Sequence, residues 1–111
     1  MSEQPLLLKK LVKALDDNQA IDIVTINVTQ QTSVTDYMVI CSGRSSRHVK
    51  AIAELVIEKM KAEGLKALSQ NGLETGEWVL VDFGDFVLHV MLADIRSFYN
   101  LEGLWQNPSN N

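Results

Sequence analysis

The stretch that runs from Tyr37 to Met60, YMVICSGRSSRHVKAIAELVIEKM, decides the fold of this chain. Its first five residues are apolar throughout, which is typical of a strand that is covered on both faces. The polar residues 42–46 then turn the chain, and Ser45 or Ser46 can cap a helix by accepting a hydrogen bond from an early backbone N–H. Beyond this turn apolar residues recur at helical spacing, at Val49, Ile52, Ala53, Val56, Ile57 and Met60. The stretch therefore predicts a buried strand followed by an amphipathic helix.

The residues before this stretch predict one helix and one strand. Apolar side chains stand at i, i+3, i+4 and i+7 on one face of the helix, at Leu8, Leu11, Val12 and Leu15. Pro5 suits the first turn of this helix, and the Asp-Asp-Asn run at 16–18 ends it. From Ile21 to Val28 apolar and polar residues alternate, as in a strand with one buried face. A polar loop over 30–35 then leads into the buried strand.

The residues after Met60 predict three strands and a short helix. Gly64 supplies the left-handed residue that ends the long helix, and a short strand is expected over 65–68. Residues 78–82 and 86–92 are expected to form a hairpin, joined by Phe83-Gly84-Asp85. A short helix from about 94 to 100 follows, residues 101–105 pack the end, and residues 106–111 form a polar tail.

The expected order of elements, α-β-β-α-β-β-β-α, gives an α/β fold with a mixed sheet of about five strands and helices packed on it. The strand–helix–strand unit over 37–68 is expected to be a right-handed crossover between parallel strands. A length of 111 residues suits one domain with one core, whose ordered part is expected over about 6–105.

Charge argues against nucleic acid and for a basic protein as the partner. The formal net charge of −4 argues against broad nucleic-acid binding, which needs a basic surface. From Ala67 to Ile95 there is no Lys or Arg, while the stretch holds Glu74, Glu77, Asp82, Asp85 and Asp94. Such a stretch favours a basic protein partner, and the alternative is that the carboxylates only keep the surface solvated.

Cys41 is the only cysteine, so it cannot form an internal disulfide, and one cysteine cannot build a metal cluster. No apolar run approaches the length that spans a bilayer, and residues 1–5 lack the pattern of a signal peptide. We therefore expect a cytoplasmic protein without a membrane partner.

The turn at 42–46 is the strongest candidate for phosphoryl chemistry. It points backbone N–H groups of a helix N-terminus at a spot where an anion can sit, but the Gly-x-x-x-x-Gly-Lys pattern of a phosphate-binding loop is missing. The turn is similar to the Gly-Ser turn of nucleotidyltransferases, which hold metal ions with paired carboxylates on the next strand, and residues 65–68 contain none. We expect no metal, no cofactor and no catalytic residue. A residual nucleotide-binding or nucleotidyltransferase enzyme is the alternative.

Single reactive side chains are weaker candidates for catalysis. His89 could act as a base, but no Ser or Cys nucleophile is identifiably paired with it, so a core histidine with one satisfied hydrogen bond is the better interpretation. Cys41 is interpreted as a small core residue rather than a reactive thiol. Asp82 and Asp85 flank a hairpin tip, where carboxylates more often serve turns and surface recognition than acid–base catalysis.

Trp78 is the residue that most suggests a binding surface. Val79 and Val81 are expected to face the core, which leaves Trp78, Leu80 and Asp82 on the opposite face of the strand. Exposed aromatic residues beside charges are enriched at protein interfaces. The alternative is that a helix covers this face of the sheet as well.

Three segments resemble the signatures of a known family. They are residues 35–49 (TDYMVICSGRSSRHV), 78–90 (WVLVDFGDFVLHV) and 96–105 (RSFYNLEGLW). Their order and spacing are similar to those of the ribosomal silencing factor family, the Iojap-related proteins, and the resemblance runs from about Leu6 to Trp105. Arg44 departs from the small residue expected at its position, which affects only the turn before the long helix.

The resemblance implies a nucleotidyltransferase-like α/β fold without catalytic carboxylates, and a protein that is not an enzyme. It also implies binding to ribosomal protein L-fourteen on the intersubunit face of the large ribosomal subunit. Such binding would block subunit joining sterically and lower translation when nutrients are limited. The family's partner surface maps by position onto Trp78, Leu80, Asp82, Asp85, His89 and Met91. Members are expected to be homodimers when isolated, with one copy on each subunit, and a general dimeric scaffold is the alternative.

Overall fold

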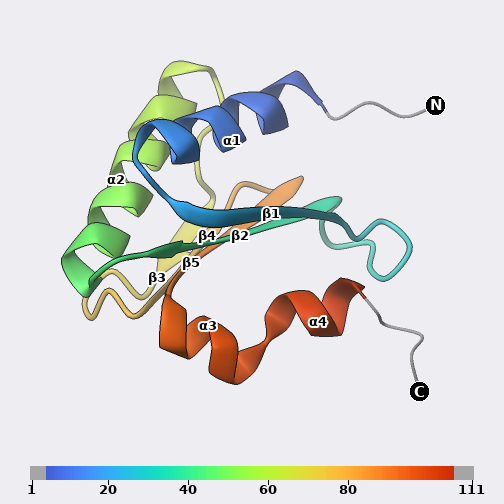
Figure 1. Cartoon of the computed structure of the whole chain (residues 1–111). Helices are drawn as coiled ribbons and strands as arrows, with labels where there is room; N and C mark the ends of the chain where they lie inside the picture. The colour runs from blue at the N-terminus through green and yellow to red at the C-terminus, as the bar shows by residue number, and fades with distance from the viewer. Residues whose placement is uncertain (1–4, 107–111) are drawn as a thin grey trace.

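Two layers of helices enclose a five-stranded sheet in the computed structural model, which describes residues 5–106 (Figure 1). The strand order across the sheet is β1 (Ile21–Asn27), β2 (Tyr37–Gly43), β5 (Phe86–Leu92), β4 (Trp78–Asp82) and β3 (Ser69–Asn71). Strands β2 and β5 are parallel, and the other neighbours are antiparallel. The predicted α/β fold with a mixed five-stranded sheet is therefore confirmed.

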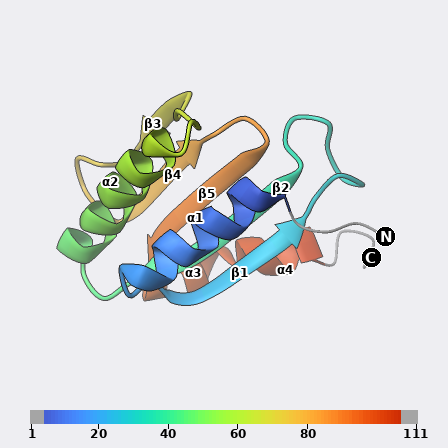
Figure 2. The ribbon, with the colours of Figure 1, turned by 90° about the horizontal axis from the view of Figure 1, so that it is seen from above.

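Helices α1 (Leu6–Asp17) and α2 (Ser46–Ala62) lie side by side on one face of the sheet, as seen from above in Figure 2. The predicted apolar stripes of both helices face the sheet. From α1, Leu8, Leu11 and Leu15 are fully buried there. From α2 the same core takes Val49, Ile52, Ala53, Val56 and Met60. Val12 and Ile57, at the margins of the two stripes, are only half-buried.

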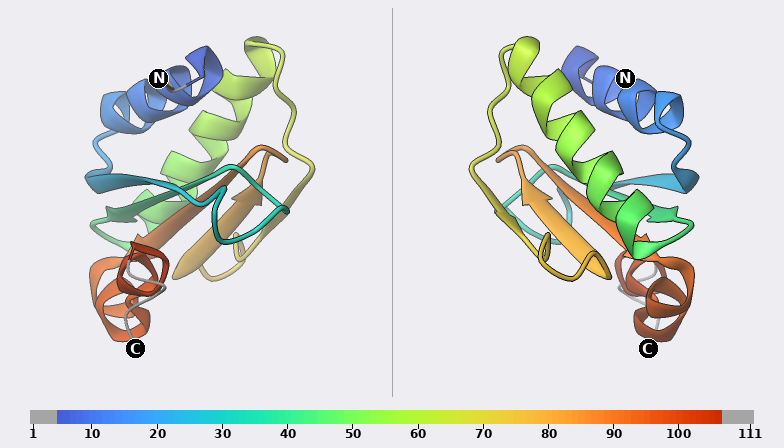
Figure 3. Two further views of the ribbon diagram at one scale, coloured as in Figure 1. Left: turned by 90° about the vertical axis from the view of Figure 1, so that its right-hand side faces the viewer. Right: turned by 90° about the vertical axis from the view of Figure 1, so that its left-hand side faces the viewer.

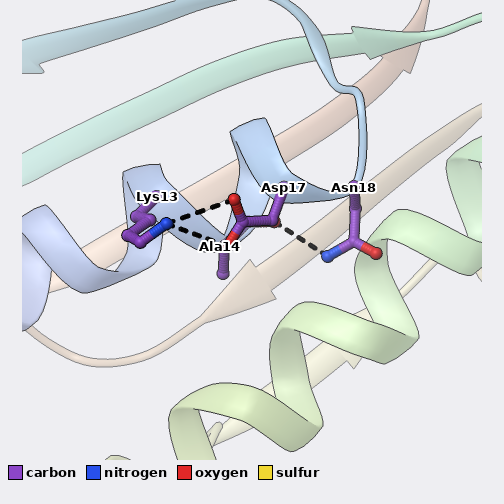
Figure 4. Close-up of polar contacts among 4 residues, drawn as sticks. All are labelled: Lys13, Ala14, Asp17 and Asn18. Carbon is purple, nitrogen blue, oxygen red and sulfur yellow. Dashed lines mark hydrogen bonds and ion pairs between the residues drawn. The ribbon is translucent and has the colours of Figure 1, made fainter.

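Local hydrogen bonds mark the end of α1 and the start of α2, where the sequence predicted a helix end and an N-cap. At the end of α1 the Asn18 amide Nδ2 donates to the Ala14 carbonyl over 2.8 Å, and Lys13 pairs with Asp17 over 3.3 Å (Figure 4). At the start of α2 the Ser45 hydroxyl accepts the His48 backbone N–H over 3.1 Å, as a cap should. Gly64 has a φ of +91° just after α2, which confirms its left-handed role.

The opposite face of the sheet carries a second, smaller apolar cluster. Figure 3 shows helices α3 (Ala93–Tyr99) and α4 (Leu101–Gln106) on the other side of the sheet from α1 and α2. Ile95 of α3 and Leu101 of α4 pack against buried residues of β1, β2 and β5 and of the residue after β1, which are Ile26, Val28, Met38, Ile40 and Met91. Asn100 turns the corner between these helices with a left-handed φ of +50°. Only one helix was predicted for this region.

The prediction of a strand over 65–68 is wrong. The third strand is Ser69–Asn71, an exposed edge strand that pairs antiparallel with β4. It runs in the same direction as β2, but β5 and β4 lie between them, so α2 crosses the sheet to its far edge. The apolar residues 65–68 misled the prediction, because Leu65 and Ala67 pack on the core from a connecting segment. Residues 107–111 of the predicted polar tail lie outside the described residues, and Gln106 closes α4.

Candidate partner-binding surface

Strand β4 presents different side chains to the two sides of the sheet. Val79 and Val81 are fully buried in the core that α1 and α2 cover, whereas Trp78, Leu80 and Asp82 on the other face are half-buried. The predicted alternation in this strand is confirmed. The side chains beside them on β5 are His89, opposite Leu80, and Met91, opposite Trp78.

Trp78 belongs to a row of three aromatic rings that we call the aromatic row, formed by Trp78, Tyr99 and Phe98. The ring centroids of Trp78 and Tyr99 are 4.9 Å apart, and those of Tyr99 and Phe98 are 5.0 Å apart with the rings edge to face. Exposure increases along the row, from the half-buried Trp78 to Tyr99 at 53% and Phe98 at 80%. Large exposed rings that support one another are typical of anchors at protein interfaces.

His89 anchors the indole of Trp78 through a hydrogen bond from the buried side. The Trp78 Nε1–H donates to Nδ1 of His89 over 3.0 Å, so in the neutral ring the proton sits on Nε2. His89 is only 8% exposed, and this burial lowers the pKa of its imidazole to about 4. The interpretation of His89 as a core histidine with a satisfied hydrogen bond is confirmed.

Burial changes the role of two of the six residues mapped to the partner surface. Met91 has no exposed surface and packs in the second apolar cluster with Trp78, and His89 is nearly as deep. Their exposure does not support direct contact with a partner, because other side chains would first have to move. In this structure both residues support the tryptophan, and the outer surface is formed by their neighbours.

The acidic residues of the predicted surface lie at the hairpin tip. One carboxylate oxygen of Asp82 accepts the backbone N–H of Gly84 over 2.8 Å, so this side chain also serves the turn. Asp85 is exposed, and its backbone carbonyl accepts the N–H groups of Asp36 and Tyr37. Leu80 is half-buried between the tip and Trp78. The structure thus places Trp78, Leu80 and Asp82 on one face of β4, and it places Asp85 exposed at the hairpin tip that follows.

Sequence reasoning missed Tyr99 and Phe98 as members of this surface. A short helix whose last turn holds two adjacent aromatic residues was a usable signal, because only one side of so short a helix can be buried. The contact with Trp78 was not predictable, since it joins residues from separate elements.

The remaining candidates for chemistry take part in structural contacts. Cys41 is fully buried, and desolvation raises the pKa of its thiol to about 12, so it stays a neutral core residue as predicted. The predicted turn at 42–46 is tied down by His48, whose Nδ1 accepts the Arg44 backbone N–H over 2.9 Å while its Nε2 bonds the Asn18 carbonyl over 3.1 Å. Within residues 5–106 no cluster of three or more His, Cys, Asp or Glu could hold a metal ion. Within the same residues no helix is long and apolar enough to cross a membrane.

The chain matches the family described as "Ribosomal silencing factor during starvation" over residues 1–111. It belongs to the ribosomal silencing factor family. Among relatives with that name, the protein of Zymomonas mobilis is 45% identical over 90% of this chain and 75% of its own length. The one from Bacillus subtilis is 40% identical over 92% of this chain and 86% of its own. The mouse protein named "Mitochondrial assembly of ribosomal large subunit protein 1" is 39% identical over 86% of this chain and 43% of its own length.

The fold agrees with this family membership. A crystal structure of a Chromobacterium violaceum protein superimposes on this chain with a TM-score of 0.90 at 40% identity, over 95% of this chain and 88% of the other. The predicted family is thereby confirmed. Names that contain Iojap also occur among the relatives, including the chloroplast protein of maize, 33% identical over 89% of this chain and 43% of its own length.

Proposed function

We propose that this silencing factor binds ribosomal protein L-fourteen on the large ribosomal subunit and sterically blocks the small subunit from joining. Translation would then fall when nutrients are limited. The observation that carries the proposal is the partly exposed aromatic row at one end of β4, with Asp82 and Asp85 at the other end, in a chain that belongs to the ribosomal silencing factor family. We place the partner contact on Trp78, Leu80, Asp82, Asp85 and Tyr99, with His89 and Met91 beneath them.

The chemistry of this surface suits a basic protein in an RNA-rich surrounding. A ring can fill an apolar groove of the partner, while exposed carboxylates such as Asp85 attract Lys or Arg and speed association. The stretch from Ala67 to Ile95, which contains Trp78 and the hairpin tip, carries five acids and no Lys or Arg, so its charge favours a basic protein over nucleic acid as the partner. A protein partner therefore accounts for the surface better than direct, sequence-specific nucleic-acid binding does.

We further propose that the protein acts without catalysis, in the cytoplasm, and as a homodimer when it is free of ribosomes. Ser45 caps α2 and His48 holds the turn through Arg44, so this serine and this histidine form no nucleophile–base pair. Residual nucleotide binding is the rival function for this turn. Nucleotide-dependent stabilisation against heat, lost on mutating residues 42–46, would favour the rival.

Subunit joining tests the proposal directly. Purified large and small subunits are mixed with and without the protein and separated on a sucrose gradient, with the protein followed by immunoblot. We expect a smaller joined-ribosome peak, larger free-subunit peaks, and protein that migrates with the large subunit. Preformed, translating ribosomes should resist, because the small subunit already covers the site. An unchanged profile at saturating protein would refute the proposal.

A charge variant at the hairpin tip provides a matched comparison. Asp85→Asn removes one exposed carboxylate and keeps the side-chain shape, so it should slow association at low salt and leave dissociation nearly unchanged. Glu58→Gln makes the same chemical change on an exposed position of α2, on the opposite side of the sheet, and should have no effect. Equal behaviour of the two variants would mean that the hairpin tip does not face the partner.

A further inference from the structure

The corner formed by α3 and α4 is fastened to the sheet through one buried arginine. Arg96 is 8% exposed, and its guanidinium reaches three separate parts of the chain. Nη1 donates to the Ser42 hydroxyl at the end of β2 over 2.9 Å and approaches the Ile21 carbonyl at the start of β1 at 3.4 Å. Nε donates to one carboxylate oxygen of Glu102 in α4 over 2.9 Å, and Nη2 forms an ion pair with the same oxygen, also at 2.9 Å.

This fastening supports one end of the aromatic row. Arg96 and Tyr99 lie three residues apart on α3, so they are neighbours on the helix surface and move together. Besides Arg96, α3 and α4 are held to the sheet by the apolar contacts of Ile95 and Leu101 with the second cluster. Apolar contacts permit small sliding and rotation, whereas a forked arginine with several fixed acceptors does not. The orientation of Tyr99 against Trp78 therefore depends on the guanidinium.

The energetics of the pair favour a role in positioning. Removing an arginine and a carboxylate from water is costly, and a buried ion pair often adds little net stability. The second oxygen of Glu102, Oε1, is buried and has no hydrogen-bond partner among the described residues, so the pair is not optimised for stability. Buried ionic groups are useful where they specify one arrangement among several.

We propose that Arg96, held by Glu102, is a positioning residue that sets the α3–α4 corner so that Tyr99 packs against Trp78 and the aromatic row meets the partner. This inference rests on the proposed function for its effect on subunit binding. Neither residue is required to touch the partner, since both side chains are largely buried. Substitution of Arg96 or Glu102 should therefore have the same effect on Trp78 and on subunit binding as substitution of Tyr99.

Two measurements on the same variants test the proposal. Trp105→Phe makes Trp78 the sole tryptophan, and acrylamide quenching of its fluorescence then reports how well Tyr99 covers it. In this background Arg96→Ala should raise quenching to the level of Tyr99→Ala and weaken binding to large subunits about tenfold, the loss expected from one misplaced aromatic contact. The double variant should be no worse than either single variant, because both remove the same contact. Arg47→Ala, at an exposed position of α2, removes the same charge and should change neither measurement.

Chemical rescue separates positioning from a general loss of structure. Arg96, Ser42 and Glu102 border an open cavity of about 760 Å³, through which small molecules can reach the vacated place. Guanidinium ion at tens of millimolar should restore low quenching and binding to Arg96→Ala, whereas NaCl of equal ionic strength should not. The ion should not rescue Tyr99→Ala. If Arg96→Ala fails to fold, Glu102→Ala, which keeps the arginine and its bonds to β1 and β2, should show the same two losses in milder form.

Each failure has a distinct meaning. Should the unmodified protein not bind large subunits, the proposed function fails, while the quenching of Trp78 still decides whether Arg96 sets the row. Low quenching and full binding in both Arg96→Ala and Glu102→Ala would overturn the positioning role. High quenching with full binding would also overturn it, because the row would then not matter to the partner. Additive losses in the double variant, or no rescue by guanidinium, would also overturn the proposal, because Arg96 and Glu102 would then only stabilise the fold.

Discussion

Replacement of Trp78 by alanine removes the centre of the aromatic row and separates its two roles. An aromatic anchor of this kind contributes about 2 kcal/mol or more to binding, so Trp78→Ala should weaken subunit binding roughly thirtyfold or more. In the free protein the change leaves Nδ1 of His89 without its donor, which costs about 1–3 kcal/mol for a buried group. Loss of the ring contact with Tyr99 adds about 0.5–1.5 kcal/mol, and the lost packing of the half-buried ring adds less than the about 3–5 kcal/mol that is typical of a fully buried one.

These losses are smaller than the stability of an ordinary domain, about 5–15 kcal/mol, so the variant should melt earlier but remain folded at 25 °C. Trp78→Phe is the matched control, because it keeps an aromatic ring and loses only the N–H donor. It should lose about 1–3 kcal/mol of stability, less than Trp78→Ala loses, and retain much of the binding. Thermal melting by circular dichroism and co-sedimentation with large subunits are measured on both variants.

The outcome that refutes this reasoning is a folded Trp78→Ala that still binds large subunits with unchanged affinity. A variant that no longer folds would show instead that Trp78 is a core residue in energetic terms, despite its partial exposure. If Trp78→Phe loses as much binding as Trp78→Ala, then the indole N–H and its bond to His89 matter to the partner more than the ring does.

Three further predictions concern groups inside the fold. Burial lowers the pKa of His89 from 6.5 to about 4, so below pH 6.5 the unfolded chain binds a proton more tightly than the folded one does. The contribution of His89 to the free energy of unfolding should therefore be complete above pH 6.5 and fall by about 3 kcal/mol by pH 4. Denaturant titrations across this range check it, and His89→Gln should flatten that part of the profile. Cys41 should react with a thiol reagent only as fast as the protein unfolds, since its buried thiol has a pKa of about 12; fast labelling at pH 7.5 without denaturant would contradict this. Gly72→Ala should lower the stability more than Gly64→Ala does, although both glycines have positive φ. The new methyl at Gly72 would lie 2.0 Å from the Trp78 carbonyl oxygen, whereas the space beside Gly64 is open. Equal melting temperatures of the two variants would argue against the close approach.

Much of the fold followed from local patterns in the sequence. Alternation along residues 78–82, with a Gly-containing turn before residues 86–92, predicted β4 and β5 with the bounds that the structure has. The stripe of α2, the stop at Gly64 and a serine N-cap were also correct, with Ser45 the one of the two candidate serines that caps, because capping and helical periodicity involve residues only a few positions apart. The strand over 65–68 failed for the opposite reason, since a short apolar segment has no period that distinguishes a strand from a packed connection.

The amino-acid sequence by itself determined the α/β class, most of the elements, the inward face of β4 and the family. Tertiary structure alone decided which strands became neighbours, that Tyr99 lies against Trp78, that His89 and Met91 sit beneath the surface, and that Arg96 is buried between three elements. The physical reason is the range of the interactions. Periodicity and capping depend on neighbours along one element, whereas the burial of a charge or the stacking of two rings depends on how distant elements pack together, and that packing is set by the free energy of the whole core.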